Sequence, residues 1–136
     1  MIIKDCFENL EIGGHSLQGI KLQIDGNRPE KIIERAKSIK YIIGESNNHI
    51  VGIGGYDDLK IHTLFVSRQL HGSGIGKIIL NEIIYRAKID RIKCLTTWST
   101  IYAQGFYTKN GFETIKDVYM PEDTKDIQLI EMKRFI

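Results

Sequence analysis

Three glycines at alternate positions, Gly72, Gly74 and Gly76, separate an apolar segment from a second segment whose apolar residues recur at helical spacing. Glycine permits turns that other residues resist and leaves the backbone N–H groups uncovered. A helix that starts here places the positive end of its dipole directly behind the loop. Uncovered amides in that position bind anions, most often phosphate. The sequence therefore predicts a phosphate site formed by Gly72, Ser73, Gly74, Ile75, Gly76 and Lys77.

Two common phosphate loops do not fit these residues. A Walker A loop needs a glycine five residues before the glycine of its Gly-Lys pair and a serine or threonine after the lysine, where this chain has His71 and Ile78. A Rossmann loop needs the pattern Gly-x-Gly-x-x-Gly and an acid at the end of the next strand. Here the last gap is too short, and the strand that ends at Trp98 supplies no acid.

The surrounding sequence alternates between helical and extended patterns. Apolar residues at helical spacing predict helices over residues 29–39, 75–88 and 101–109. Apolar segments bounded by turn residues predict strands over residues 41–45, 50–56, 60–66, 92–98, 112–119 and 126–134. This order predicts an α/β or α+β layered domain, with a mixed sheet and helices on its faces. Residues 1–26 contain glycines that interrupt any periodic pattern, and they are expected to form either an edge strand or a flexible arm.

Length, composition and charge limit the class of protein. A chain of 136 residues, of which 42% are hydrophobic, predicts a single globular domain over residues 1–136. A net charge of +2 is too small to predict a nucleic-acid or membrane partner. Cys6 and Cys94 match neither a metal-binding spacing nor a disulfide framework, so we expect reduced thiols and no metal. Without a recognisable signal peptide or membrane-spanning run, the expected location is the cytoplasm.

Two segments resemble the motifs of the GNAT-type N-acetyltransferase superfamily. Gln69-Leu70-His71-Gly72-Ser73-Gly74 matches the family's acyl-CoA loop, Arg/Gln-x-x-Gly-x-Gly/Ala, which lies between an apolar strand and a helix. Residues 103–112, Ala-Gln-Gly-Phe-Tyr-Thr-Lys-Asn-Gly-Phe, are similar to the family's Ala-x-x-Phe-Tyr-x-x-x-Gly-Phe segment. The resemblance covers residues from about 41 to the C-terminus. It implies a mixed, largely antiparallel central sheet with helices on both faces.

The resemblance implies acetyl-CoA as co-substrate. Its pyrophosphate would rest on the amides of residues 72–77, and His71 belongs to the same motif. Its pantetheine arm would pair with the strand end formed by Leu64, Phe65 and Val66, and an amide near Leu64 would hold the thioester oxygen as it becomes negative. Thr100 stands where many members carry an asparagine that contacts the cofactor, although its hydroxyl also suits a helix N-cap.

Tyr107 matches the tyrosine that lies near the CoA sulfur in this family. The resemblance implies that Tyr107 is the general acid that protonates the departing thiolate. An unperturbed phenol has a pKa of about 10, against about 8.5 for a thiol, so it stays protonated at neutral pH and is a weak acid. The neighbouring Phe106 is expected to be a core aromatic residue.

The general base is the point at which the sequence departs from the family pattern. Members with a carboxylate base on the third strand carry it about four residues before the position of Leu64, which is Lys60 here. His62 shares a face with these two residues if the strand is regular, and its intrinsic pKa makes it a candidate base. Asp57, Asp58 and a chain of water molecules are alternatives, and the base stays unassigned.

The implied reaction is direct transfer of an acetyl group to a primary amine of a small molecule or a peptide. Asp57, Asp58, Glu122 and Asp123 would favour a cationic amine. The chain is expected to be a monomer or a homodimer. Because Lys60 replaces the usual carboxylate, a non-catalytic acyl-CoA-binding or sensing module on the same fold is the alternative.

Overall fold

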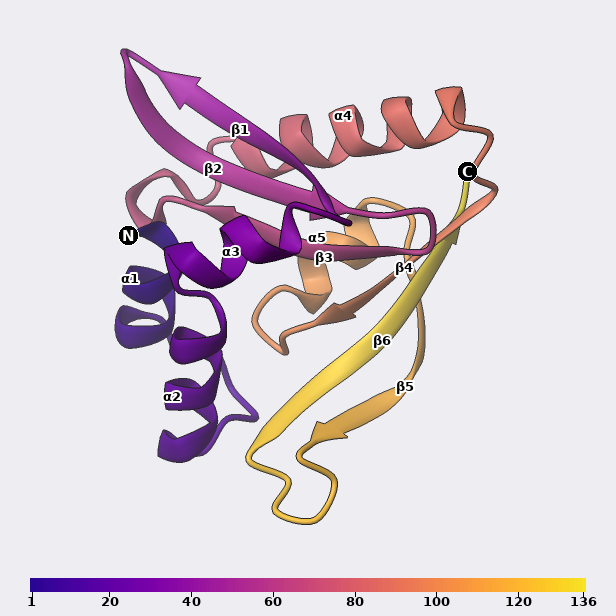
Figure 1. The fold of residues 1–136 in the computed structure, drawn as a ribbon. Coiled ribbons are helices and arrows are strands. Elements are labelled where there is room, and N and C mark those ends of the chain that lie inside the picture. The colour runs from indigo at the N-terminus through magenta and orange to yellow at the C-terminus, as the bar shows by residue number, and fades with distance from the viewer.

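The computed structural model describes residues 1–136 and contains a sheet with helices on both faces (Figure 1). The strands are β1 (Lys40–Ser46), β2 (His49–Tyr56), β3 (Lys60–Val66), β4 (Cys94–Ser99), β5 (Glu113–Met120) and β6 (Ile127–Phe135). The helices are α1 (Ile2–Asn9), α2 (Leu17–Gly26), α3 (Pro29–Arg35), the short 3-10 helix η1 (Arg68–Leu70), α4 (Ile75–Ile89) and α5 (Gln104–Lys109).

The six strands form one sheet in the order β1-β2-β3-β4-β6-β5. Every neighbouring pair is antiparallel except β3 and β4. This parallel pair is joined only where β3 begins, with Lys60 opposite Thr96 and Ile61 opposite Thr97. Beyond these residues the two strands diverge and leave a split in the sheet (Figure 1). The mixed, largely antiparallel sheet implied by the sequence is confirmed.

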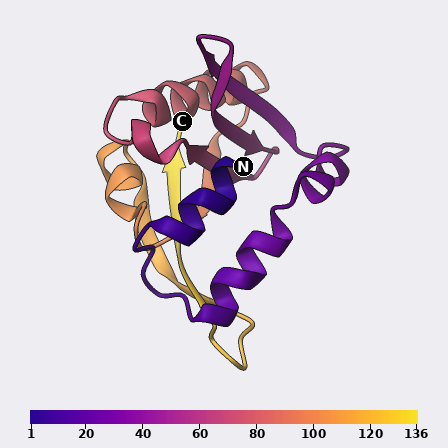
Figure 2. The same cartoon turned by 90° about the vertical axis from the view of Figure 1, so that its left-hand side faces the viewer.

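Helices α4 and α5 lie on one face of the sheet, and α2 and α3 lie on the other (Figure 2). The apolar stripe of α4, which includes Ile79 and Ile83, is buried in the main hydrophobic core. A second, smaller core forms where Phe7 of α1 packs against Phe65 of β3. Burial of each large apolar side chain stabilises the fold by about 1.5–3 kcal/mol, so the two cores hold the divided sheet from both faces.

The strands and the helices that follow residue 28 lie close to the segments predicted from the sequence. The helix predicted over residues 29–39 ends earlier, at Arg35, and the one predicted over residues 101–109 begins later, at Gln104. The later start has a structural reason, because a turn follows β4. In that turn the amide of Ala103 donates to the carbonyl and the hydroxyl oxygen of Thr100.

The expectation of an edge strand or a flexible arm over residues 1–26 is wrong, because this segment forms α1 and α2. Ile3, Cys6 and Phe7 are each 2% exposed, and their spacing is that of the buried face of a helix. Ser16 caps α2, and its hydroxyl oxygen accepts a hydrogen bond from the amide of Gly19 at 3.0 Å. The glycines of this segment indicated a break in structure, although Gly19 lies inside a helix.

Gly19 is required because α2 closely approaches the chain that precedes β6. A Cβ atom at this position would lie 2.1 Å from the carbonyl oxygen of Asp126. We expect Gly19→Ala to lower the free energy of unfolding by about 1–3 kcal/mol, although alanine is the better helix former. Gly26→Ala in the same helix is the matched control, because a Cβ there meets nothing within 4 Å. Urea denaturation measures both variants, and equal stabilities would contradict the close approach.

Strand β3 contains a β-bulge at His62. The register between β2 and β3 shifts by one residue here, which leaves His62 without a partner in β2. Ile61 and Leu64 consequently pack against the same core, the one that α4 covers. Lys60 precedes Ile61 and therefore lies on the opposite face from Leu64. The expectation that Lys60, His62 and Leu64 share one face is wrong because the strand is not regular.

Both cysteines are free thiols, and Cys6 is buried. No group of three or more histidine, cysteine, aspartate and glutamate side chains is arranged to hold a metal ion. None of the helices has the length and apolar character that crossing a membrane requires.

Candidate active site

The glycine loop leads from β3 through η1 into α4. Gly72 and Gly74 have φ angles of 82° and 93°, in the left-handed region that glycine adopts without strain. Gly74 is the N-cap of α4 and supplies no capping side chain. The amides of Ile75, Gly76 and Lys77, in the first turn, donate no hydrogen bond within the protein. With the helix dipole behind them, these donors are arranged to bind an anion.

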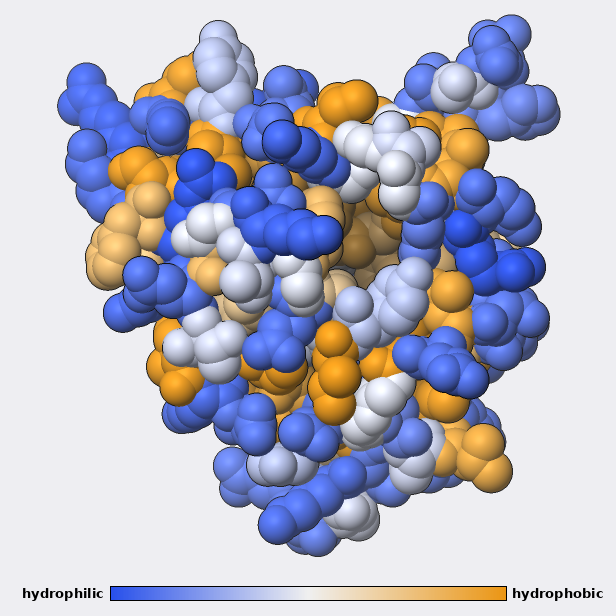
Figure 3. Space-filling view, turned by 180° about the vertical axis from the view of Figure 1, so that it is seen from behind, coloured by the Kyte–Doolittle hydropathy of each residue, from blue (hydrophilic) through white to orange (hydrophobic).

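A cavity of about 820 Å³ lies at the split in the sheet and is lined by residues of both β3 and β4. One part of it, the loop end, is lined by the glycine loop and α5 and includes Lys77 and Phe106. The other part, the helical end, is lined by α1, α2 and α3 and includes Gln23 and Arg35. From behind, the surface is hollowed, with apolar residues in the depth and hydrophilic residues around the rim (Figure 3). The cavity therefore connects the two faces of the sheet.

The open edge of β3 presents backbone groups to the cavity. Ser67 N donates to Val51 O of β2, so the antiparallel alternation also directs the backbone groups of Phe65 toward β2. The backbone groups of Leu64 and Val66 point the other way, into the split. Of the three residues expected to pair with a pantetheine arm, Leu64 and Val66 have N–H and C=O groups that face the split, whereas those of Phe65 face the neighbouring strand.

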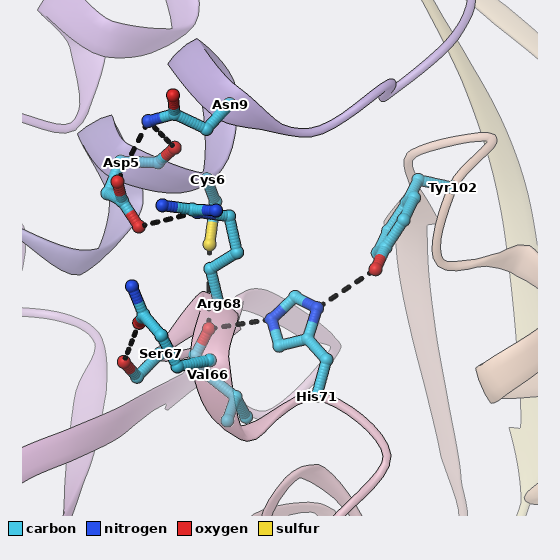
Figure 4. A network of polar contacts seen from close by, with 9 residues as sticks. Asp5, Cys6, Asn9, Val66, Ser67, Arg68, His71 and Tyr102 are labelled. Atoms are coloured by element: carbon cyan, nitrogen blue, oxygen red, sulfur yellow. Dashed lines mark hydrogen bonds and ion pairs between the residues drawn. The ribbon is translucent and has the colours of Figure 1, made fainter.

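His71 bridges the open end of the split (Figure 4). Its Nε2 donates to Val66 O at 2.8 Å, because a carbonyl can only accept, and its Nδ1 accepts from the Tyr102 hydroxyl at 2.9 Å. Val66 O also accepts from Cys6 Sγ at 3.5 Å. Burial and the nearby Asp5 raise the pKa of the Cys6 thiol, which keeps it protonated as a donor. Both lone pairs of Val66 O are thus in use, and a ligand that pairs with this carbonyl must displace a donor.

Tyr107 lies beside the point at which β3 and β4 part. Its ring makes edge contacts with Phe106 and Phe112, at centroid distances of 5.3 and 5.2 Å. The side chain of Thr97, the residue that pairs with Ile61 at the end of the joined segment, acts on this hydroxyl and lowers its pKa. Burial raises the pKa of Tyr107 to about 12, despite the opposing effect of Thr97. The phenol therefore stays protonated throughout the physiological pH range.

His62 lies at the same point of the split, one residue after the last paired residue of β3. Its Nε2 lies 2.7 Å from Asp57 Oδ2. The other carboxylate oxygen, Asp57 Oδ1, accepts from the amides of Leu59 and Lys60, both at 2.9 Å. Burial raises the pKa of Asp57, but the hydrogen bonds from Leu59, His62 and Lys60 together hold it below its ordinary value. An ionised carboxylate that orients an imidazole is the arrangement of a general base and its supporting partner.

Lys60 occupies the position at which related proteins were expected to carry a carboxylate. Its Nζ lies 3.4 Å from the centroid of the Trp98 ring, a cation–π contact. Burial lowers the pKa of Lys60, and the charges of Glu131 and Asp57 act in the opposite direction. The cavity wall at this position is therefore cationic and aromatic.

Two threonines line the cavity in different ways. Thr63 is 2% exposed, and its Oγ1 has no hydrogen-bond partner in the protein. A buried hydroxyl without a partner costs about 1–3 kcal/mol, which a polar atom of a bound ligand would recover. Thr100 Oγ1 accepts from the amide of Ala103 at 3.2 Å, as a capping residue does.

The cavity brings together most of the residues selected from the sequence. Those that line it are His62, Leu64, Phe65, Val66, His71, Gly72, Gly74, Gly76, Lys77, Thr100 and Tyr107. None of the four acids expected to favour a cationic amine, Asp57, Asp58, Glu122 and Asp123, is among the residues that line it. Sequence reasoning missed Gln23, Asn27 and Arg35, and the first of these lies on a helix that the sequence pattern did not reveal.

A family model described as Acetyltransferase (GNAT) domain matches residues 13–134. No curated protein matches the chain. The family model covers the segment from the connection after α1 to the end of β6, and so includes the split, the glycine loop and Tyr107.

Solved GNAT structures share the fold. A GCN5-related N-acetyltransferase from Rhodopseudomonas palustris has a TM-score of 0.88 at 16% identity, over 99% of this chain and 86% of that one. PaiA N-acetyltransferase from Thermoplasma acidophilum, in complex with coenzyme A, has a TM-score of 0.78 at 17% identity, over 99% and 89% of the two chains. A GNAT family acetyltransferase from Elizabethkingia anophelis with acetyl-CoA bound has a TM-score of 0.65 at 20% identity, over 80% and 84%.

Proposed function

The chain belongs to the GNAT acetyltransferase family, and from this premise we propose that it transfers an acetyl group from acetyl-CoA directly to a primary amine. The observation that carries the proposal is the split between β3 and β4, which opens into one cavity shared by the glycine loop, His62 and Tyr107. Such a cavity can admit a phosphate-bearing donor from the loop end and an amine from the helical end. Amine-dependent release of the CoA thiol is the experiment that tests this function.

The loop end has the groups that coenzyme A requires. The unpaired amides of Ile75, Gly76 and Lys77 would bind its pyrophosphate. The split-facing backbone of Leu64 and Val66 would pair with the amides of its pantetheine arm, which at Val66 O would displace either His71 or Cys6. Two of the similar structures contain coenzyme A or acetyl-CoA, which supports the same ligand here.

In the proposed reaction a neutral amine attacks the carbonyl carbon of the thioester. The new C–N bond forms, the C–S bond breaks, the nitrogen loses one proton and the sulfur gains one. The carbonyl oxygen becomes negative in the intermediate, and a backbone amide near Leu64 is the proposed donor to it. The reaction needs one group to remove the amine proton and one group to supply the sulfur proton.

Tyr107 is the proposed acid. With a pKa of about 12, it is a neutral donor that can hydrogen-bond to the sulfur as negative charge develops there. Complete transfer of its proton to a free thiolate, whose conjugate pKa is about 8.5, would be unfavourable by about 5 kcal/mol. Donation by Tyr107 therefore has to accompany C–S cleavage, and the amine proton must be removed in the same turnover.

His62, supported by Asp57, is the proposed base. It lies at the start of the split on β3, next to Ile61, whose partner on β4 is Thr97, the residue that lowers the pKa of Tyr107. Because Nε2 donates its hydrogen bond to the ionised Asp57, Nδ1 is the nitrogen able to accept a proton. This assignment provides a base where Lys60 takes the place of the expected carboxylate.

Replacing His62 tests the base. We expect His62→Gln to lower kcat/KM by about 100-fold, because general base catalysis contributes at least that much. Asp57→Asn should lower it by about tenfold, because the turn can persist while the ionised partner of the imidazole is lost. His49→Gln, at the exposed histidine that begins β2, is the control and should leave the rate unchanged. Equal rates for the His62 and His49 variants would assign proton removal to another group.

A further inference from the structure

The charges that line the cavity are all positive. Its charged residues are Lys77 and Lys109 at the loop end, and Arg35 and Lys60, which lie away from the glycine loop; none of the lining residues is aspartate or glutamate. The two lysines at the loop end suit the phosphates of coenzyme A. The other two cations are left without a function in binding the donor, and they face the part of the cavity that the acceptor would enter.

Arg35 carries a charge that no acid of the protein neutralises. Its Nη2 donates to Gly26 O and to Asn27 Oδ1, both at 3.1 Å, and both acceptors are uncharged. Its Nε is buried and makes no hydrogen bond. Arg28, at the N-cap of the same helix, instead forms an ion pair with Asp25 at 2.9 Å. Arg35 is thus half-buried beside the cavity with donors and charge in excess of its partners.

The neighbouring amides hold Arg35 in place. Asn27 Nδ2 donates to Gln23 O at 2.8 Å, while Asn27 Oδ1 accepts from Arg35, so Asn27 fixes the guanidinium against α2. Gln23 lines the cavity beside these residues, and its Nε2 lies 3.3 Å from His15 Nε2. An arginine whose orientation is fixed in this way is suited to bind a carboxylate through two parallel hydrogen bonds.

We propose that the acceptor is an amino carboxylate, a compound that carries both a primary amine and a carboxylate, and that Arg35 binds the carboxylate. This inference rests on the proposed acetyltransferase function. Lys60 adds a second positive charge to the cavity, so an acceptor with several amino groups and no acid would be repelled. The remaining lining of the helical end is largely apolar, with Phe7, Leu10 and Ile12, and suits an amino acid with an apolar side chain.

The test compares acceptors that differ only in the carboxylate. α-Amino and ω-amino acids with apolar carbon chains are each assayed beside their primary amides, with spermidine as the polycation, and rates are expressed per concentration of neutral amine. We expect kcat/KM to be at least about tenfold higher for at least one acid than for its amide, because a hydrogen-bonded charge pair is lost in the amide. Arg35→Gln should remove this preference. Arg28→Gln is the matched control and should retain it.

Binding provides a second readout that does not depend on turnover. In the presence of coenzyme A, the preferred acid should raise the melting temperature of the protein more than its amide does. An amide or spermidine that is used as well as every acid would overturn the proposal, and so would a preference that persists in Arg35→Gln. If Arg35→Gln does not fold, the comparison of acid with amide in the unmodified protein still decides. Failure of the proposed function has a different result, in which no amine releases CoA whatever its charge.

Discussion

Tyr107→Phe is expected to lower kcat by about 100-fold while the affinity for coenzyme A changes by less than about twofold. The phenylalanine ring retains the edge contacts with Phe106 and Phe112 and removes only the hydroxyl that would donate to the sulfur. The loss therefore falls on the step in which charge develops on the leaving group. Steady-state kinetics with the best acceptor measure kcat, and the melting temperature with coenzyme A reports binding.

Tyr85→Phe is the control for this substitution, because Tyr85 lies on the exposed side of α4, 62% exposed, away from the cavity lining. It should keep the parent rate. A Tyr107→Phe variant with an unchanged kcat would show that another group protonates the sulfur.

The raised pKa of Tyr107 also has a consequence for stability. The phenol ionises near pH 10 in the unfolded chain, against about 12 in the folded protein. The contribution of the neutral Tyr107 phenol to the free energy of unfolding is complete below about pH 10. It is lost as the pH rises from about 10 to about 12, which lowers the free energy of unfolding by up to about 3 kcal/mol. The free energy of unfolding of Tyr107→Phe should consequently fall less steeply than that of the parent over this range. Urea denaturation at about pH 9 and about pH 11 compares the two slopes, and parallel slopes would contradict the burial of this phenol.

Gly74→Asp is expected to weaken the binding of coenzyme A by at least about 100-fold. Gly74 is the N-cap of α4, and a carboxylate there would repel the pyrophosphate and compete for the free amides of Ile75, Gly76 and Lys77. A Cβ at Gly74 meets nothing within 4 Å, so the fold has room for the new side chain, although its φ of 93° adds strain. Calorimetric titration with coenzyme A measures the change.

Asn48→Asp is the matched control for the loop variant. Asn48 also has a positive φ, 63°, and lies in the exposed turn between β1 and β2. The substitution therefore introduces the same charge far from the cavity. Coenzyme A should bind this control as it binds the parent. If Gly74→Asp bound coenzyme A with full affinity, the phosphates would have to bind at a place other than the start of α4.

Most of the fold could be predicted from short-range patterns in the sequence. The alternate glycines and the apolar stripe of α4 are local features, and they located the loop and the helix correctly. The order of strands and helices, together with the Phe106-Tyr107 segment, led to the mixed sheet and the family. These features are encoded over a few consecutive residues, which is why the sequence was sufficient for them.

The missed features depend on contacts between distant segments. At Gly19, helix α2 closely approaches Asp126, and no local sequence pattern predicts this contact. The bulge at His62 arises from the register with β2, and it moved Lys60 away from the face of Leu64. The pairing of Asp57 with His62 had a local signal, a turn acid five residues before the histidine, but its geometry comes from the bulged strand.

The helical end of the cavity also depends on contacts between segments that are distant in the sequence. Arg35 lies on a helix that the sequence predicted, yet its exposure to the cavity follows from α2 and from Asn27, which hold it there. Its charge has no partner only because no acid happens to face it in three dimensions.

The split in the sheet is proposed to be a site for acetyl transfer and not only for binding of the cofactor. This role is tested most directly by incubating the protein with acetyl-CoA and a panel of amino acids, their amides, peptides and polyamines, and by following free thiol together with the mass of the acceptor. The proposed function requires amine-dependent release of coenzyme A, matched mole for mole by an N-acetylated product. Saturable binding of acetyl-CoA with no acetylated product across the panel would contradict it and favour a non-catalytic acyl-CoA-binding module.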